Sequence, residues 1–139
     1  MAALKWIVCG GRVGRGLTKN LVWSVLDTLA ERCPENRITV VHGGAVWVDT
    51  WAGEWAKARG HLECRVEING ELDGYRERAP MNRNRRMLQE NIEADRCLGF
   101  PGGGGTNDMM EICHKAGIPV GDIEVESNGD WELKWWPQK

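Results

Sequence analysis

Short apolar runs alternate along this chain with longer stretches in which apolar residues recur every three or four positions. That alternation is typical of a parallel β-sheet whose strands are joined by crossover helices. We predict core strands at residues 4–9, 38–42, 62–68, 97–100 and from 118–120, and helices at residues 17–32, 46–59, 81–93 and 107–116. The strand at 62–68 carries polar residues on one side, so we expect it at a sheet edge.

The C-terminal part of the chain has a different pattern. Residues 123–125 and 131–136 alternate apolar and polar positions around Asn128-Gly129, a strong hairpin signal. We therefore predict an α/β fold with a Rossmann-like, doubly wound and mainly parallel sheet over residues 1–121. Residues 122–139 form a C-terminal β-hairpin extension of the same domain.

Three glycine clusters each follow a predicted strand and precede a predicted helix: Gly10-Gly11, Gly43-Gly44 and Gly102 to Gly105. In an open parallel sheet such turns share the carboxyl edge, where ligands bind at the topological switch point. Glycine lets backbone N–H groups approach an anion, and the N-terminus of the following helix adds a partial positive charge. The sequence predicts a phosphate site from the three turns together, although each turn taken alone is more simply explained as a tight turn with no ligand. None of the three has the Walker A pattern or a full dinucleotide fingerprint.

The order of several motifs resembles the SLOG superfamily, and most closely its small YspA-like branch. The motifs are Gly-Gly-Arg at 10–12, His-Gly-Gly-Ala with Asp49 at 42–49, Arg-Asn-x-x-Met at 83–87, Phe-Pro-Gly-Gly-Gly-Gly-Thr at 100–106 and Gly-Ile-Pro-Val at 117–120. The superfamily also contains the LOG (lysine-decarboxylase-like) phosphoribohydrolases and the DNA-processing protein DprA. The resemblance implies a Rossmann-like sheet with a site for nucleotides or phosphoribosyl groups.

The resemblance also implies the residues of that site. The glycine-rich loop and Thr106 would wrap a phosphate, Asp49 matches the acidic position of the family, and the Arg83 guanidinium would pair with a phosphate or with ribose oxygens. The full predicted set is Gly10, Gly11, Arg12, Gly43, Gly44, Ala45, Trp47, Asp49, Arg83, Asn84, Pro101, Gly102, Gly103, Gly104, Gly105 and Thr106.

Two positions depart from the family pattern. The LOG signature has a catalytic glutamate three residues after the threonine, where this chain has Met109. LOG-type hydrolysis is therefore in doubt, and the catalytic residue of any reaction is unknown. Relatives usually have a small glycine in place of Trp47, whose indole either blocks a phosphate or offers a stacking face to a base.

Composition narrows the function classes. The chain has 139 residues with a formal net charge of −2, which argues against a general polyanion binder. Its five cysteines are odd in number and contain no CxxC pair, so reduced thiols in the cytoplasm, or in the host cytoplasm if a phage encodes the chain, are expected. The three histidines have no metal-ligand spacing, and we expect no metal, no cofactor and no membrane contact.

We therefore expect the protein to bind a nucleotide or an ADP-ribose-like ligand as a sensor or a sequestering protein, a role that the family has in phage–host conflict. One alternative is a nucleotide N-glycosidase that uses Asp49, Glu111 or another carboxylate. A third is single-stranded DNA binding, as in DprA, through an arginine run that starts at Arg76; the acidic total makes nucleic acid the weakest candidate. A tryptophan stripe at 47, 51 and 55 and three hairpin tryptophans suggest a homodimer or a higher homo-oligomer.

Overall fold

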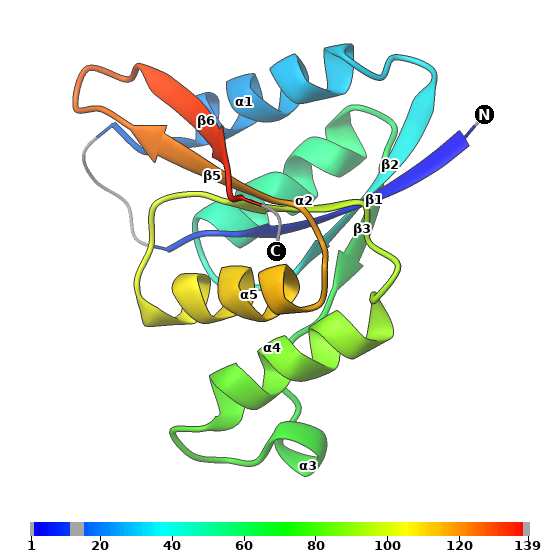
Figure 1. The fold of residues 1–139 in the computed structure, drawn as a ribbon, viewed down its shortest axis with the longest axis vertical. Helices are drawn as coiled ribbons and strands as arrows, with labels where there is room; N and C mark the ends of the chain where they lie inside the picture. Colours follow the sequence, from blue (N-terminus) through cyan, green and yellow to red (C-terminus); the bar gives the residue numbers. More distant parts are fainter. Residues whose placement is uncertain (1, 12–15, 138–139) are drawn as a thin grey trace.

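A six-stranded sheet in the order β3-β2-β1-β4-β5-β6 forms the centre of the molecule (Figure 1). The computed structural model describes residues 2–11 and 16–137. The first five strands run parallel and β6 is antiparallel to β5. The strands are β1 (Ala2–Cys9), β2 (Asn36–His42), β3 (Leu62–Arg65), β4 (Arg96–Gly99), β5 (Val120–Val125) and β6 (Trp131–Trp135).

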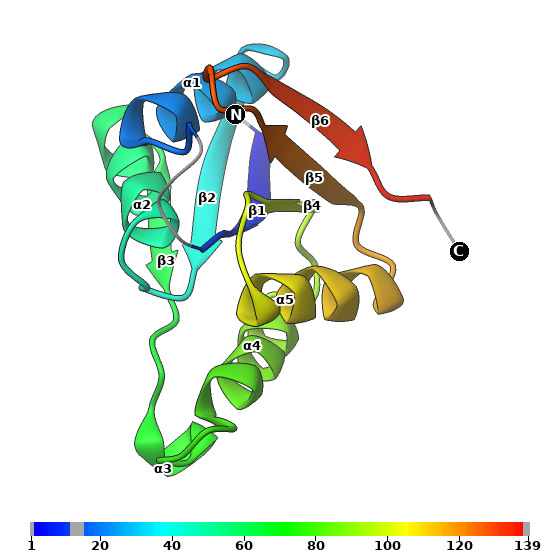
Figure 2. The same ribbon diagram turned by 90° about the vertical axis from the view of Figure 1, so that its left-hand side faces the viewer.

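Helices cover both faces of the sheet, as the alternating pattern predicts. The helices are α1 (Lys19–Glu31), α2 (Val48–Ala58), α3 (Gly70–Asp73), α4 (Ala79–Glu90) and α5 (Gly104–Lys115). Helices α1 and α2 pack on one face, with Trp6 and Trp55 in the core, whereas α4 and α5 pack on the other, with Met87 and Cys113 in the core (Figure 2). The Rossmann-like fold expected from the sequence is thereby confirmed.

The connections define where a ligand would bind. From β1 the chain crosses over to β2 on one side, and it later returns to β4 on the other side of β1. The carboxyl ends of β1 and β4 therefore flank the topological switch point of the sheet, where open α/β sheets have their binding crevice. Glycines 10 and 11 follow β1 there, and the glycine-rich loop 102–105 follows β4.

Several element boundaries differ from the predicted ones. The strand predicted at 62–68 ends at Arg65, because β2 ends at His42 and offers no further pairing partner. The helix predicted from residue 107 begins at Gly104, so two of the loop glycines form its first turn. The segment predicted as a loop over 69–80 contains α3, and α4 begins at Ala79 with Pro80 in its first turn, a favourable position for proline.

The C-terminal hairpin is continuous with the parallel sheet. The two predicted strand pieces, 118–120 and 123–125, correspond to the one strand β5, which begins at Val120 and also includes residues 121 and 122. This strand pairs with β4 through Cys97 and Val120 and with β6 through Ile123 and Leu133. The turn predicted at Asn128-Gly129 is present, and Gly129 has a φ of 92°, in the region that glycine adopts without strain.

No helix within residues 2–11 and 16–137 is both long enough and apolar enough to cross a membrane.

Candidate ligand site at the switch point

A cavity of about 270 Å³ lies where the carboxyl ends of β1 and β2 meet the N-terminus of α5. Both the turn after β1 and the turn after β2 contribute to its walls, and α4 closes the opposite side. Residues predicted as ligand contacts that line it are Gly10, Gly11, Gly43, Ala45, Asp49, Arg83, Asn84, Gly103, Gly104, Gly105 and Thr106.

Other predicted residues do not line this cavity. Gly44, Trp47, Pro101 and Gly102 lie outside its lining, and Arg12 lies outside the described residues. Pro101 and Gly102 still shape the wall, because the Pro101 carbonyl accepts a hydrogen bond from the Gly11 amide at 3.0 Å. A Cβ on Gly11 would stand 2.6 Å from the Gly102 Cα, so two glycines are needed where these two turns meet.

The first turn of α5 offers unpaired amide donors to the cavity. The helix has no side-chain cap at Gly103, and its first internal bond runs from the Asn107 amide to the Gly103 carbonyl. The amides of residues 104–106 therefore have no hydrogen-bond partner among the described residues, as is general for the first turn of a helix. Cβ positions at Gly104 and Gly105 meet nothing within 4 Å, and both residues line the cavity. Such a helix end can bind an anion.

The turn after β2 is built differently, because its amides are already used. The Asp49 carboxylate accepts hydrogen bonds from the Gly43 amide at 3.0 Å and from the Ala45 amide at 3.3 Å. The Gly44 amide donates to Nδ1 of His42 at 3.0 Å. A ligand on this side of the cavity therefore meets no unpaired amide from residues 43–45, and the charged groups available to it are side chains.

Asp49 contributes an unpaired carboxylate oxygen. Its Oδ2 accepts both amide bonds, whereas Oδ1 is buried and has no hydrogen-bond partner within the part of the chain that the structure describes. Burial raises the pKa of this carboxyl group, and the two amide bonds and the charges of His42 and Arg83 oppose that rise. Oδ1 can therefore accept a hydrogen bond from a hydroxyl group, or donate a hydrogen bond when the carboxyl group is protonated.

Arg83 reaches across the cavity from α4. Its Nη1 donates to the Gly43 carbonyl at 2.6 Å and to the Val66 carbonyl at 3.4 Å. A Cβ on Gly43 would lie 2.4 Å from this nitrogen, which explains the glycine at that position. Nη2 has no partner among the described residues, and it is free to bind an anion. Burial lowers the pKa of Arg83, while the nearby Asp49 carboxylate raises it.

Asn84 joins α4 to the start of α5. Its side-chain amide donates to the Gly105 carbonyl at 3.1 Å and to Asp108 at 3.2 Å, and its oxygen accepts from Nε of Arg83 at 3.1 Å. All of its polar atoms are therefore used within the protein. Asn84 positions Arg83 and the first turn of α5 relative to each other.

The floor of the cavity is apolar, and the sequence analysis did not predict it. Val8, Cys9, Met87 and Met109 line it, and each is buried. The position at which LOG enzymes have a catalytic glutamate thus faces the cavity, but it carries a thioether. Val8 and Cys9 could have been found from the sequence, since they are the last strand residues before Gly10-Gly11.

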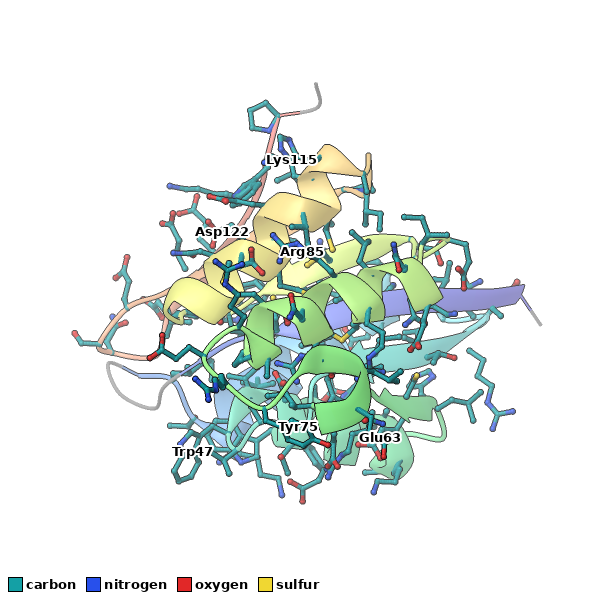
Figure 3. The ribbon with its side chains drawn as sticks, turned by 90° about the horizontal axis from the view of Figure 1, so that it is seen from below. Trp47, Glu63, Tyr75, Arg85, Lys115 and Asp122 are labelled. Carbon is teal, nitrogen blue, oxygen red and sulfur yellow. The ribbon has the colours of Figure 1, made fainter. Side chains whose placement is uncertain are left out.

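Trp47 has the one positive φ of a non-glycine residue in the described ranges, 75° with a ψ of −115°. Its indole lies at the periphery of the molecule (Figure 3), with its ring centroid 5.7 Å from that of Trp51. This backbone conformation suits the glycine expected from the family pattern, because a side chain with a Cβ is strained in this region. The ring lies outside the cavity lining and does not fill it.

Replacing Trp47 with glycine should raise the free energy of unfolding by about 1 kcal/mol. Relief of strain is worth about 1–3 kcal/mol, and the lost contact with Trp51 offsets part of it. Trp47→Ala is the matched control, because it retains the Cβ and loses only the indole. Urea unfolding followed by circular dichroism should rank glycine above tryptophan and tryptophan at or above alanine; an alanine variant as stable as the glycine variant contradicts the strain.

The arginine run is divided among several internal contacts. Arg83 enters the cavity, Arg85 pairs with Asp108 at 3.4 Å between α4 and α5 (Figure 3), and Arg86 forms a two-point pair with Asp73. Arg76 and Arg78 have no ion pair among the described residues and lie on the loop before α4. The run therefore does not form one continuous basic face for nucleic acid.

The Asp73–Arg86 pair should make the free energy of unfolding depend on pH in the acidic range. Asp73 is buried, and the Arg86 guanidinium lowers its pKa from 3.8 to about 2. A carboxyl group with a lowered pKa in the folded state stabilises the protein above its unfolded pKa, and this contribution is lost as the pH falls through the folded pKa. About 2 kcal/mol should disappear between about pH 5 and pH 2.

Urea unfolding of the parent chain and of Asp73→Asn at several pH values measures this contribution. The stability difference between the two proteins should be largest near neutral pH and shrink toward pH 2. A difference that stays constant over this range contradicts the assignment to Asp73.

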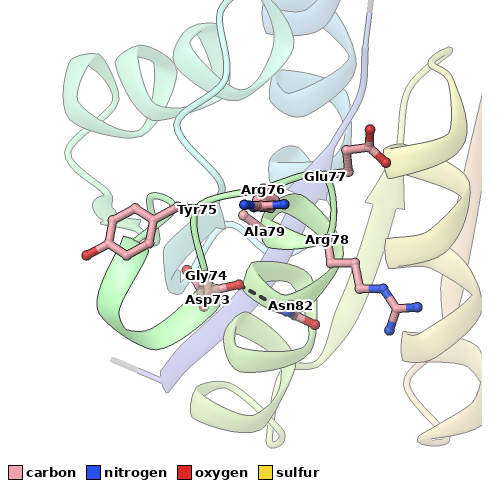
Figure 4. Close-up of a pocket in the computed structure, with 8 residues that line it drawn as sticks. All are labelled: Asp73, Gly74, Tyr75, Arg76, Glu77, Arg78, Ala79 and Asn82. Atoms are coloured by element: carbon pink, nitrogen blue, oxygen red, sulfur yellow. Dashed lines mark hydrogen bonds between the residues drawn. The ribbon is translucent and has the colours of Figure 1, made fainter.

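A larger hollow of about 850 Å³ lies beside the loop between α3 and α4 (Figure 4). One continuous segment, residues 73–82, supplies all of its lining, and Tyr75 and Arg78 point to opposite sides of it. The Asn82 side chain donates to the Asp73 carbonyl at 3.0 Å, so its amide is already used. The hollow does not bring together chemistry from separate elements, unlike the cavity at the switch point.

Within residues 2–11 and 16–137, no group of histidine, cysteine and carboxylate side chains is arranged to hold a metal ion. The five cysteines are free thiols.

Comparison with known proteins agrees with the motif order. No curated protein matches the chain. The family model YAcAr, described as YspA, cpYpsA-related SLOG family, matches residues 5–72, which run from β1 into α3. The match contains the turns after β1 and β2 together with Asp49, and the α5 loop and Arg83 complete the same cavity from later in the chain. Residues 5–72, just under half of the chain, are thus similar to the YspA-related branch of the SLOG superfamily.

Proposed function

We propose that the protein binds a nucleotide-derived ligand through its phosphoribosyl group in the cavity at the switch point. The observation that carries this proposal is that the first turn of α5, whose amides are unpaired, lines the same cavity as Arg83 and as Asp49, whose buried Oδ1 has no hydrogen-bond partner among the described residues. The α5 amides and the Arg83 guanidinium carry positive charge and suit a phosphate, whereas the Asp49 carboxylate suits a sugar hydroxyl. The similarity to the SLOG superfamily is consistent with a nucleotide-related ligand.

The size of the cavity supports a small bound group. Ligand pockets commonly measure roughly 300–1,000 Å³, and this cavity of about 270 Å³ is at the lower end. A ribose phosphate fits this volume, and the base or second nucleotide of a larger ligand would extend beyond the enclosed part. The proposal therefore covers nucleoside phosphates, ADP-ribose-like species and cyclic signalling nucleotides.

We propose a sensing or sequestering role, without turnover. Met109 leaves the cavity floor without the carboxylate that LOG enzymes use, and the buried groups near it are thioethers and a thiol. An apolar floor under a cationic rim suits retention of an anionic ligand.

Calorimetric titration and thermal denaturation with AMP, ADP-ribose and ribose 5-phosphate test the proposal. Adenosine is the matched ligand without phosphate. A phosphorylated ligand at saturating concentration should raise the melting temperature, because it binds only the folded state, and adenosine should have little effect. Failure of every phosphorylated ligand, or an equal effect of adenosine, overturns the proposal. Mass spectrometry of small molecules released from the purified protein would identify a ligand that co-purifies.

Asp49 supports a second candidate, a nucleotide N-glycosidase. Its raised pKa and its unpaired oxygen suit a general acid that protonates a leaving base. Incubation with nucleoside monophosphates should then release free base, and Asp49→Asn should abolish the release while ligand binding persists. Absence of free base leaves the binding role.

A further inference from the structure

The strand β6 leaves one edge of the sheet unpaired. It hydrogen-bonds to β5 on one side, and its other side has no partner within the described ranges. The opposite edge of the sheet is β3, which has only four residues. An unpaired edge strand presents free N–H and C=O groups to which another strand can add.

The hydrogen-bond pattern identifies which groups of β6 are free. The Glu126 amide donates to the Asp130 carbonyl, and the Trp136 amide donates to the Val120 carbonyl, each at 2.8 Å. In an antiparallel pair, backbone polar groups point alternately toward and away from the partner strand. The backbone N–H and C=O groups of residues 130, 132, 134 and 136 therefore point toward β5. Trp131, Leu133 and Trp135 present their N–H and C=O groups to the outside.

We propose that β6 pairs in antiparallel fashion with β6 of a second copy of this chain, about a two-fold axis at Leu133. The sequence of the strand is Trp-Glu-Leu-Lys-Trp, which is complementary to itself when reversed. Leu133 lies opposite its own copy, Trp131 lies opposite the partner's Trp135, and Glu132 lies opposite the partner's Lys134. The three outward-facing residues thereby become the hydrogen-bonded pairs of the new ladder, which joins two sheets into one.

On each face of the joined sheet, the side chains of the two copies complement each other. Trp131 and Leu133 pack against the α1 and α2 core on one face, and Trp135 on that face is 46% exposed. The guanidinium of Arg96 lies 5.3 Å from the Trp135 ring. Pairing places the partner's Trp131 beside Trp135, which covers the exposed indole. Cross-strand aromatic pairs stabilise antiparallel sheets.

Charge complementarity on the opposite face favours a second copy over other occupants. Within one chain, Glu132 lies opposite Glu124 in the register, and Lys134 pairs with Glu124 at 3.3 Å. Glu132 forms no close ion pair among the described residues of its own chain, and it acts on Lys134, two residues along the strand, only through its charge. Across the two-fold axis it gains the partner's Lys134, and the same contact forms twice because the interface is symmetric.

Sedimentation equilibrium with Glu132→Lys tests the proposed interface. The parent chain should dimerise to twice its 15.6 kDa, and this substitution should raise the dimer Kd at least about tenfold by opposing two pairs of like charge. A lysine at 132 faces Glu124 within the chain, so the urea midpoint should not fall. Glu35→Lys makes the same change of charge on an exposed turn and should leave the Kd unchanged.

The double variant Glu132→Lys/Lys134→Glu exchanges the two charges and should restore dimerisation. Leu133→Cys tests the register, because the two cysteines would face each other across the axis. Oxidised glutathione should then convert it, but not the parent chain, to a covalent dimer on a non-reducing gel. A parent chain that is monomeric throughout the titration, or a dimer that neither Glu132→Lys weakens nor Leu133→Cys cross-links, overturns the proposal.

Discussion

Substitution of Gly104 by aspartate is expected to lower the affinity for AMP or ADP-ribose at least about 100-fold while the fold becomes more stable. A side chain at this position meets no protein atom within 4 Å, so it fits without strain. Its carboxylate would occupy the space in front of the unpaired amides of α5 and repel a phosphate. An acidic residue in the first turn and the loss of a flexible glycine together stabilise a helix by about 1 kcal/mol.

Gly104→Ala is the matched control for this prediction. It shares the steric and helix-forming change without the negative charge, so it should be more stable than the parent and retain most of the affinity. Calorimetry measures the affinity and urea unfolding measures the stability of each variant. If the Gly104→Asp variant binds these ligands as tightly as the parent chain, the amides of α5 do not contact the ligand.

Arg83→Met is expected to lower the affinity for the same ligands about 100-fold and to lower the free energy of unfolding by about 2–3 kcal/mol. The affinity falls because Nη2 no longer meets the phosphate. The stability falls because the Gly43 and Val66 carbonyls lose their donor and the buried Asp49 carboxylate loses a nearby cation. Methionine is a suitable replacement, since it retains much of the side-chain length without charge.

Arg78→Met removes an arginine from the loop before α4, outside the cavity, and serves as the control. Its affinity and stability should equal those of the parent. An Arg83→Met protein that folds and binds as tightly as the Arg78→Met protein would contradict the role of Arg83. Two measurements separate the effects. Urea unfolding without ligand reports the loss of stability alone, and calorimetric titration of the folded variant reports the loss of affinity.

Several features of the site followed from local sequence chemistry. Glycines after strands and before helices predicted the carboxyl-edge turns, and the glycine-rich loop and Arg83 were both placed among the predicted contacts. Other features depended on contacts between distant segments. The amides of residues 43–45 resembled a phosphate loop in sequence, but the carboxylate of Asp49 and the imidazole of His42 already bind them. A glycine pair in a sequence does not reveal which acceptor its amides will meet.

The role of Asn84 illustrates the same limit. Its position beside Arg83 suggested a ligand contact, whereas in the fold its side chain bonds to the Gly105 carbonyl, to Asp108 and to Arg83. These partners lie on α5 and on α4 itself, and the packing of the two helices brings them together. Trp47 differs again, because its unusual residue type was visible in the sequence but its positive φ was not.

The sequence by itself determined the α/β class, the crossover topology, the hairpin turn and the glycine turns at the strand ends. These features depend on periodicity and on the backbone freedom of glycine, which act over a few neighbouring residues. Only the tertiary structure decided which amides remain free for a ligand, that Met109 and Cys9 form the cavity floor, and that 131, 133 and 135 present the open edge of β6. Each of these depends on hydrogen-bond partners and packing neighbours that are far apart in the chain.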